Sequence, residues 1–218
     1  MIVLVLDVET TGLPEDRNAN LTDSGRWPYV VQLSWLLFDL SQNELLSCND
    51  HLIRLPEGKS VPPESTAIHG ISTERMRNDG KDIYPILTAL AEDMKLCTYI
   101  VAHNIDFDKT MIRVESLRSG LPDMFAEGLK LQFCTMKYGE PLCGLTMVSK
   151  RNGRTISKFP RLSELHNELF GKAPENLHDS LIDVLVCFRC FCKMTLGVDP
   201  VDINEKFRTK WAASVNRL

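Results

Sequence analysis

The sequence predicts an α/β protein in which a mixed sheet is flanked by helices. Three apolar segments of strand-like composition come first, at residues 2–6, 29–40 and 45–55, and a short polar turn joins the last two. Short connections favour antiparallel pairing, so we expect these segments to form a three-strand meander. Helix and strand patterns then alternate towards the C-terminus, which favours parallel strands for the rest of a five-stranded sheet.

Hydrophobic spacing and helix-ending residues locate the later elements. In chain order these are a helix from Asp82 to Met94, a strand at 98–102, a helix from about Phe107 to Gly120, a strand at 131–134, a helix at 162–171 and a helix at 179–196. Asp82 belongs to the residue types that cap helix N-termini, and Gly171 to the type that ends helices. The segments 10–28 and 56–65 are rich in turn-forming residues and are expected to be loops.

Length and composition indicate one globular domain. The chain has 218 residues, of which 44% are hydrophobic and 25% are charged, so it can bury a core. Residues 1–197 contain all the predicted elements, and we expect residues 198–218 to be a basic C-terminal extension rather than a separate domain.

The cysteines and the absence of long apolar runs bear on where the protein works. The seven cysteines are odd in number and irregularly spaced, which indicates reduced thiols and an intracellular protein, whether cytoplasmic, nucleoid or nuclear. No apolar run approaches the ~18 residues of a membrane helix, and the apolar N-terminus lacks the basic flank of a signal peptide.

The formal net charge of −4 argues against nucleic-acid binding by broad positive surface charge. If a polyanion is bound, its binding must be local or assisted by metal ions. Basic residues are concentrated in two acid-free segments, residues 150–161 and the last thirteen residues. Each segment can also be explained as a solvated loop or tail.

Two acids, Asp7 and Glu9, follow directly on the most apolar strand of the sequence. A strand places alternate residues on one face, so both carboxylates would share a face at its C-terminal end, where open α/β sheets carry their sites. Two neighbouring like charges on a buried strand are costly unless a cation compensates them. The alternative is a strand that ends at Leu6, with both acids in solvent.

A second polar segment follows the strand at 98–102. It contains His103, Asn104, Asp106 and Asp108. Either aspartate could cap the next helix, so the spacing alone does not select one of them.

A further acid, Asp183, lies on the apolar stripe of the helix at 179–196, in line with Cys187 and Cys190. An acid on such a stripe is seldom ionised without a partner. His178 lies at the mouth of the same helix, and an imidazole beside carboxylates can accept a proton near neutral pH. Carboxylates from three separate segments suit hard divalent cations, and two such ions about 3.5–4 Å apart promote phosphoryl transfer.

These segments resemble the motifs of one enzyme family, the DEDDh (DnaQ-like) 3′–5′ exonucleases. The segment Asp7–Gly12 resembles the first motif, His103–Asp108 the second and His178–Asp183 the third. In the second motif the acid follows a Phe, so the resemblance selects Asp108 over Asp106. Residues 67–71 are also similar to a segment commonly found between the first two motifs.

The resemblance spans residues 2–195, with the motifs in family order. The chain departs from the family at Ser180, where an Ala is usual, and in the segment 14–28, which many members keep shorter. Neither departure removes an acid.

The resemblance implies an RNase H-like fold and a metal-dependent 3′–5′ exonuclease. Such an enzyme removes nucleoside 5′-monophosphates from the 3′ end of DNA, for proofreading or end trimming. The four acids would hold two Mg²⁺ (or Mn²⁺), with Asp7 bridging both ions, Glu9 and Asp183 at one, and Asp108 at the other. His178 would accept the proton of the attacking water.

The family also implies contacts to the substrate. They are Thr10, Thr11 and Gly12 at the terminal 3′-hydroxyl, Leu13 as a wedge against the terminal base, Asn104 on the scissile strand and His69 at the entrance. We also expect Lys150, Arg151 and Arg154 to contact the incoming strand.

Two alternatives remain open. The same chemistry could act on RNA, as in the RNase T and oligoribonuclease branches, although Thr10 and Thr11 favour the DNA-type members. A non-catalytic, polymerase-associated binding module on the same fold would usually lose one or more acids, whereas this chain retains all four and the His. Either nuclease could work with a polymerase partner, and no membrane association is expected.

Some conspicuous side chains are not assigned to the site. Cys187, Cys190 and Cys192 lie on one helix without a second pair spaced as in a zinc ribbon, so we expect them to pack in the core. Trp27 and Trp211 are left open between packing and stacking on bases.

Overall fold

The computed structural model describes residues 1–16, 18–125, 130–174 and 177–215. A five-stranded sheet runs through the molecule in the strand order β3-β2-β1-β4-β5. The strands are β1 (Ile2–Thr10), β2 (Val30–Asp39), β3 (Glu44–Leu52), β4 (Tyr99–Ala102) and β5 (Leu131–Cys134). The first three pair antiparallel, whereas β4 pairs parallel with β1 and β5 parallel with β4. The predicted meander and mixed sheet are thereby confirmed.

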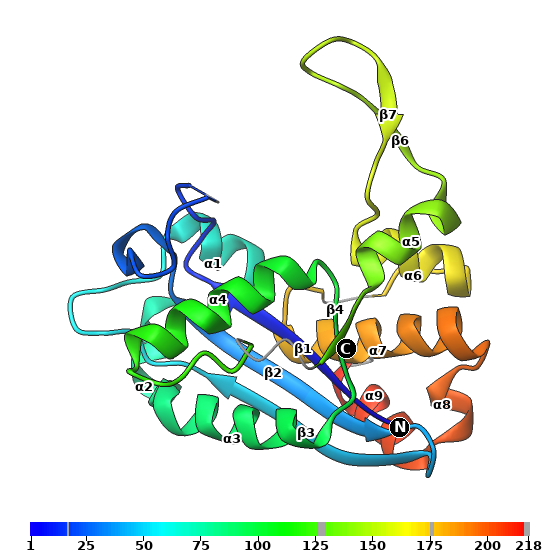
Figure 1. Cartoon of the computed structure of the whole chain (residues 1–218), viewed down its shortest axis with the longest axis horizontal. Helices are drawn as coiled ribbons and strands as arrows, with labels where there is room; N and C mark the ends of the chain where they lie inside the picture. Colours follow the sequence, from blue (N-terminus) through cyan, green and yellow to red (C-terminus); the bar gives the residue numbers. More distant parts are fainter. Residues whose placement is uncertain (17, 126–129, 175–176, 216–218) are drawn as a thin grey trace.

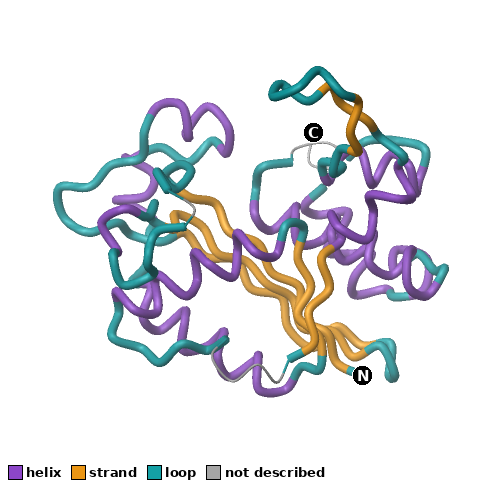
Figure 2. The backbone as a smooth tube through the Cα atoms, turned by 45° about the horizontal axis from the view of Figure 1, so that its top comes forward, coloured by secondary structure: helices purple, strands orange, loops and turns teal. Residues whose placement is uncertain are grey.

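Helices cover both faces of this sheet (Figures 1 and 2). One face carries α3 (Ile83–Leu96) and α4 (Ile105–Arg118), and the other carries α6 (Leu162–Phe170), α7 (Ser180–Leu196) and α9 (Glu205–Ser214). The side chains of β1 alternate between these faces: Leu4 and Leu6 share a core cluster with α3 and α4, whereas Val3 and Val5 share one with α7. Among the described helices, none has the length and apolar character needed to cross a membrane.

The helices begin where their sequences provide caps or turns. Asp82 caps α3 as predicted, because its Oδ1 accepts a hydrogen bond from the Tyr84 N–H at 2.7 Å. The next helix, α4, begins at Ile105, two residues earlier than predicted. Asn104 turns the chain there with a left-handed φ of 73°, a conformation that Asn adopts more readily than most residues.

The structure contains elements that the sequence did not predict. They are a 3-10 turn (Ser24–Arg26), α1 (Pro63–His69), α2 (Thr73–Asp79), α5 (Thr135–Cys143), the hairpin strands β6 (Thr146–Val148) and β7 (Thr155–Ser157), α8 (Pro200–Ile203) and α9 (Glu205–Ser214). The predicted loop 56–65 is therefore shorter than expected, since α1 begins at Pro63. Helices of two turns are too short to show a hydrophobic period, and every residue of β6 and β7 is exposed, so no apolar alternation marks them.

The C-terminal extension folds back onto α7. Phe207 and Trp211 of α9 are buried in the same core cluster as α7, so the described part of this extension, residues 198–215, is packed against the domain. The predicted extension continues to residue 218, and residues 216–218 lie outside the described ranges.

The cysteines and tryptophans that were not assigned to the site are buried. Cys187, Cys190 and Cys192 are free thiols in the core, as predicted. Trp27 is only 5% exposed and Trp211 only 8% exposed, so both tryptophans serve packing rather than base stacking.

Candidate active site

The strand β1 continues through Asp7 and Glu9 as far as Thr10, and it stays paired with β2 over this length. The alternative with a shorter strand and solvated acids is therefore wrong. Because residues alternate along a strand, Asp7 and Glu9 continue the face on which Val3 and Val5 pack against α7.

The first turn of α7 is attached to this end of β1. Ser180 Oγ donates a hydrogen bond to the backbone carbonyl of Asp7 at 2.7 Å. One turn along the helix, Asp183 faces the strand. Glu9, His178 and Asp183 each offer a ligand atom, and these three atoms lie within 4.8 Å of one another.

Asp108 reaches the same strand from α4. Its side chain is 3% exposed, and its Oδ1 accepts a hydrogen bond from the Val8 N–H at 3.2 Å. Asp106, two residues earlier, is exposed and lies 2.6 Å from the Nζ of Lys137. The helix therefore turns Asp108 towards β1 and Asp106 towards solvent.

The four carboxyls change one another's ionisation. Burial raises the pKa of Glu9 to about 8, that of Asp108 to about 8 and that of Asp183 to about 7. Burial also raises the pKa of Asp7 well above its usual range, and the charges of the other three carboxylates raise it further. Such a cluster holds protons near neutral pH unless cations replace them.

The donor set of this cluster fits hard divalent cations. Carboxylate oxygens are the ligands that Mg²⁺ and Mn²⁺ prefer. Within the described residues, Asp183 Oδ1 is buried and has no hydrogen-bond partner. A buried polar atom without a partner is costly, and a cation held with Glu9 and His178 would supply the missing interaction.

His178 lies at the mouth of this cluster. Its φ of 74° is left-handed, which is uncommon for an L-residue, and its backbone N–H donates to Asp183 Oδ2 at 3.2 Å. The side chain is exposed, although one of its ring nitrogens belongs to the group within 4.8 Å of Glu9 and Asp183. The imidazole is therefore both beside the acids and open to water.

The end of β1 and the loop after it carry the residues expected to meet the substrate. Thr10 is buried, and its Oγ1 donates to the carbonyl of Gly12 at 2.7 Å. Gly12 has a φ of 148°, which a residue with a side chain rarely adopts. Thr11 exchanges two hydrogen bonds with Tyr29, at 2.9 and 3.0 Å. Leu13 is 71% exposed, so a large apolar side chain points into solvent next to the acids' strand.

The side chain of His69 is buried and hydrogen-bonded, whereas that of Asn104 is exposed. His69 is 9% exposed, its Nε2 donates to the carbonyl of Thr10 at 3.2 Å, and its Nδ1 accepts from the Ile71 N–H at 3.1 Å. Both ring nitrogens of His69 are thus used within the protein, one of them on the backbone of Thr10. Asn104 is exposed, and its side chain makes no capping bond to α4.

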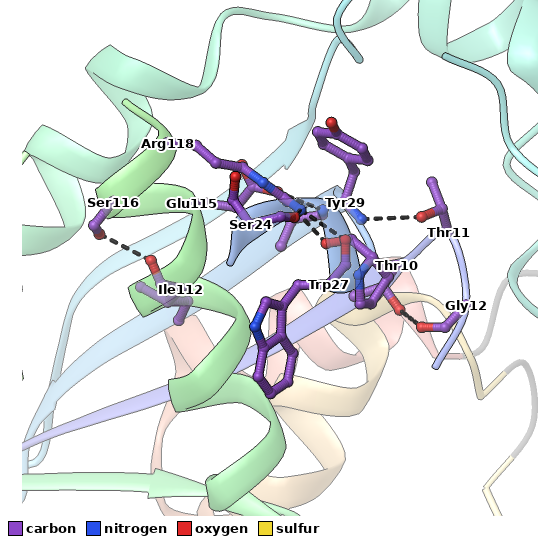
Figure 3. A network of polar contacts seen from close by, with 12 residues as sticks. Thr10, Thr11, Gly12, Ser24, Trp27, Tyr29, Ile112, Glu115, Ser116 and Arg118 are labelled. Carbon is purple, nitrogen blue, oxygen red and sulfur yellow. Dashed lines mark hydrogen bonds and ion pairs between the residues drawn. The ribbon is translucent and has the colours of Figure 1, made fainter. Parts of the chain in front are cut away.

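A buried ion pair of α4 supports the loop after β1 through the segment that leads into β2 (Figure 3). Arg118 Nη1 lies 2.6 Å from Oε1 of Glu115, which also accepts from the Val30 N–H at 3.0 Å. The guanidinium donates to three backbone carbonyls, those of Ser24, Trp27 and Pro28. It thereby holds the segment that carries Tyr29, the partner of Thr11. The sequence alone does not indicate this pair, since the groups that it contacts outside α4 lie 85 or more residues away.

Gln32 also supports the site, although the sequence alone does not indicate it. It is 2% exposed and stands opposite Glu9 on β2. Its Nε2 donates to Asp50 at 2.9 Å and to Asp179 at 3.4 Å, and its Oε1 accepts from the Ser180 N–H at 3.2 Å. The amide thus joins the N-terminus of α7 to the sheet. The sequence feature that could have indicated this role is a polar Gln within the otherwise apolar start of β2.

The predicted strand contacts Lys150, Arg151 and Arg154 are exposed and lie in the turn between β6 and β7. Figure 1 shows this hairpin standing away from the sheet. The structure does not bring these three residues to the acids.

The arrangement of strands and helices has counterparts among solved structures. This chain is similar to E. coli exonuclease I in complex with a 5cy-dT13 oligonucleotide, with a TM-score of 0.64 and 16% identity over 90% of this chain and 41% of that one. The chain has the RNase H-like fold of exonuclease I. The zinc-ion-bound complex of E. coli exonuclease I with single-stranded DNA gives a TM-score of 0.63 at 16% identity, over 90% of this chain and 41% of that chain.

An apo structure of exonuclease I gives a TM-score of 0.63 at 16% identity, over 91% of this chain and 42% of that one. The chain therefore spans about two-fifths of the exonuclease I chains that it matches. No protein-family model matches the sequence, and no curated protein matches it either. The similarity to exonuclease I shows the fold.

Proposed function

We propose that this protein is a metal-dependent 3′–5′ exonuclease that removes nucleoside 5′-monophosphates from the 3′ end of DNA. The observation that carries the proposal is the meeting of four carboxyls, from β1, α4 and α7, at one end of the sheet, with a buried oxygen of Asp183 left without a partner. The shared fold with exonuclease I, which has been solved with single-stranded DNA, supports it.

The four acids are proposed to hold two Mg²⁺ or Mn²⁺, with Asp7 shared, Glu9 and Asp183 at one ion and Asp108 at the other. When bound, such ions activate water, stabilise the leaving oxygen and neutralise the reacting phosphate. Two divalent ions would also offset the formal charge of −4, so the site would attract a phosphate backbone instead of repelling it.

His178 is proposed to accept the proton of the attacking water. Its ring stands beside Glu9 and Asp183 and is exposed, so a proton taken up by the ring can pass on to solvent. The hydrogen bond from its backbone to Asp183 holds the residue in place, and within the described residues its ring nitrogens make no hydrogen bond.

The loop after β1 is proposed to receive the 3′ end. Backbone groups of Thr10, Thr11 and Gly12 would bind the terminal hydroxyl, and the exposed Leu13 would lie against the terminal base. Asn104, whose side chain has no cap to make, would steady the strand near the bond that is cut.

A direct assay tests this function. Purified protein is incubated with 3′-labelled single-stranded DNA, with a mismatched duplex and with RNA of the same sequence, in Mg²⁺, Mn²⁺ or EDTA. We expect release of labelled nucleoside monophosphate from DNA, only with metal ion. Faster release from RNA would assign the enzyme to the exoribonuclease alternative, and no release from any substrate would overturn the proposal in favour of a binding module.

A further inference from the structure

The β6–β7 hairpin is a separate projection of the molecule. Its two strands pair only with each other and do not join the five-stranded sheet. Every residue of both strands is exposed. Figures 1 and 2 show the hairpin extending well beyond the helices around it. Such an arm contributes little to the core, so its sequence is free to serve a contact.

The arm combines positive charge with exposed apolar side chains. Residues 145–163 contain no Asp or Glu. Across the described ranges, the three cations in its turn, Lys150, Arg151 and Arg154, form no ion pair. Val148 is 64% exposed and Phe159 48% exposed on the same arm. Unpaired cations suit phosphates, and exposed apolar or aromatic side chains suit nucleic-acid bases.

The root of the arm lies beside the proposed active site. His103 Nε2 donates to the carbonyl of Pro160, where the chain returns from β7, at 3.1 Å, and its Nδ1 accepts from Thr135 Oγ1 at 3.0 Å. His103 directly precedes Asn104 and α4, which carries Asp108. The histidine thus joins the base of the arm to the start of α4, the helix that carries Asp108.

The arm is long enough to reach several nucleotides along a bound strand. Arg151 stands nine positions before Pro160, and an extended chain of nine residue steps spans at most about 30 Å. At about 3.4 Å per stacked nucleotide this corresponds to roughly nine nucleotides, and to fewer on a stretched strand.

We propose that the β6–β7 hairpin binds the nucleic-acid strand upstream of its 3′ end, with its cations on phosphates and its apolar side chains on bases. This proposal rests on the proposed exonuclease function. It predicts that substrate length, not the terminal nucleotide, determines whether the arm contributes.

The experiment compares a 4-nucleotide and a 20-nucleotide DNA with the same 3′ sequence. In the triple variant K150Q/R151Q/R154Q we expect KM for the 20-mer to rise about tenfold, while KM and kcat for the 4-mer stay unchanged. In EDTA, where hydrolysis stops, anisotropy of a labelled 20-mer should show a salt slope reduced by roughly 2, as expected for three phosphate contacts on a single strand. The matched control, R75Q/R77Q, removes exposed cations from α2, at the other end of the molecule, and should leave both substrates unaffected (Figure 1).

Several results would overturn the proposal. Equal effects of the triple variant on both lengths, or an unchanged salt slope, would remove the arm from substrate binding. A concentration-dependent dimer that V148S/I156S dissociates, in sedimentation experiments, would assign the arm to a second copy of the chain instead. If the wild type hydrolyses neither oligonucleotide, the exonuclease function fails, and the anisotropy measurement still decides whether the arm binds the strand.

Discussion

Arg118 and Glu115 form an ion pair within α4 that is almost completely removed from solvent, with side chains only 12% and 6% exposed. The guanidinium also lies 3.9 Å from the centre of the Tyr29 ring. Because Tyr29 is hydrogen-bonded to Thr11, this pair supports the loop that is proposed to meet the 3′ end of the substrate. One helix therefore carries a proposed metal ligand at its start and a support for the substrate loop near its end.

Replacing Arg118 by Met should lower the free energy of unfolding by about 3–5 kcal/mol, because Glu115 would remain buried without its partner. We also expect KM to rise by a larger factor than kcat falls. The loop after β1, which is proposed to bind the 3′ end, loses its support, whereas the four acids stay in place. Urea unfolding and steady-state kinetics on one oligonucleotide measure both effects.

The double variant R118M/E115L is the control for this interpretation. It leaves no uncompensated charge, so its loss of stability should be smaller than the sum of the losses in the single variants R118M and E115L. Strictly additive losses would show that the two side chains do not act as a pair.

Asp108 and Asp106 provide a matched pair of substitutions on α4. The variant D108N should lower kcat at least ~100-fold, since it removes a proposed ligand with little change of volume. The variant D106N should keep wild-type kcat, because Asp106 is exposed and its carboxylate pairs with Lys137 at the surface. Comparable losses in both variants, measured as nucleotide release, would refute the assignment.

Metal binding should stabilise the protein in a pH-dependent way. Without metal, the raised pKa values of Glu9, Asp108 and Asp183 mean that the folded state binds more protons than the unfolded state between about pH 4 and 8. The metal-free stability should therefore fall as the pH rises through this range. Mg²⁺ should raise Tm more at pH 8, on the order of 5 °C, than at pH 6, where protons compete for the same oxygens.

Thermal unfolding in EDTA and in Mg²⁺ at the two pH values tests this. D183N should reduce the gain at pH 8, because it removes one of the oxygens that are proposed to bind the ion. A gain in Tm that is larger at pH 6 would argue against a cation bound by these carboxylates.

His103 should make the protein sensitive to acid. Burial lowers its pKa to about 4, whereas the unfolded value is ~6.5. The unfolded state binds the extra proton between these values, so the contribution of His103 is complete above about pH 6.5 and is lost as the pH falls towards 4. The shift corresponds to at most about 3 kcal/mol. Unfolding of wild type and H103Q from pH 7 to 4 measures this, and a difference that stays constant with pH would be the contrary result.

The sequence by itself determined the sheet and the candidate acids Asp7, Glu9 and Asp183, whereas spacing alone left Asp106 and Asp108 as alternatives. The run of apolar residues that ends in Asp7 and Glu9 defines both a buried strand and the face of its carboxylates, because alternation along a strand depends only on local backbone geometry. The cap at Asp82 and the apolar stripe around Asp183 are local in the same way. For this reason the meander, the helices α3 and α7 and these three acids could be predicted from short stretches of chain.

Tertiary structure alone decided which residues support the site. Gln32 reaches the N-terminus of α7 across 148 residues of sequence, and Arg118 reaches the carbonyl of Pro28 across 90 residues. Periodicity indicates which face of an element is apolar, but it carries no information about the distant polar groups that this face will meet. The β6–β7 hairpin could not be predicted for a related reason. Its strands have no buried side, and only a strand with one buried face shows alternating apolar and polar residues.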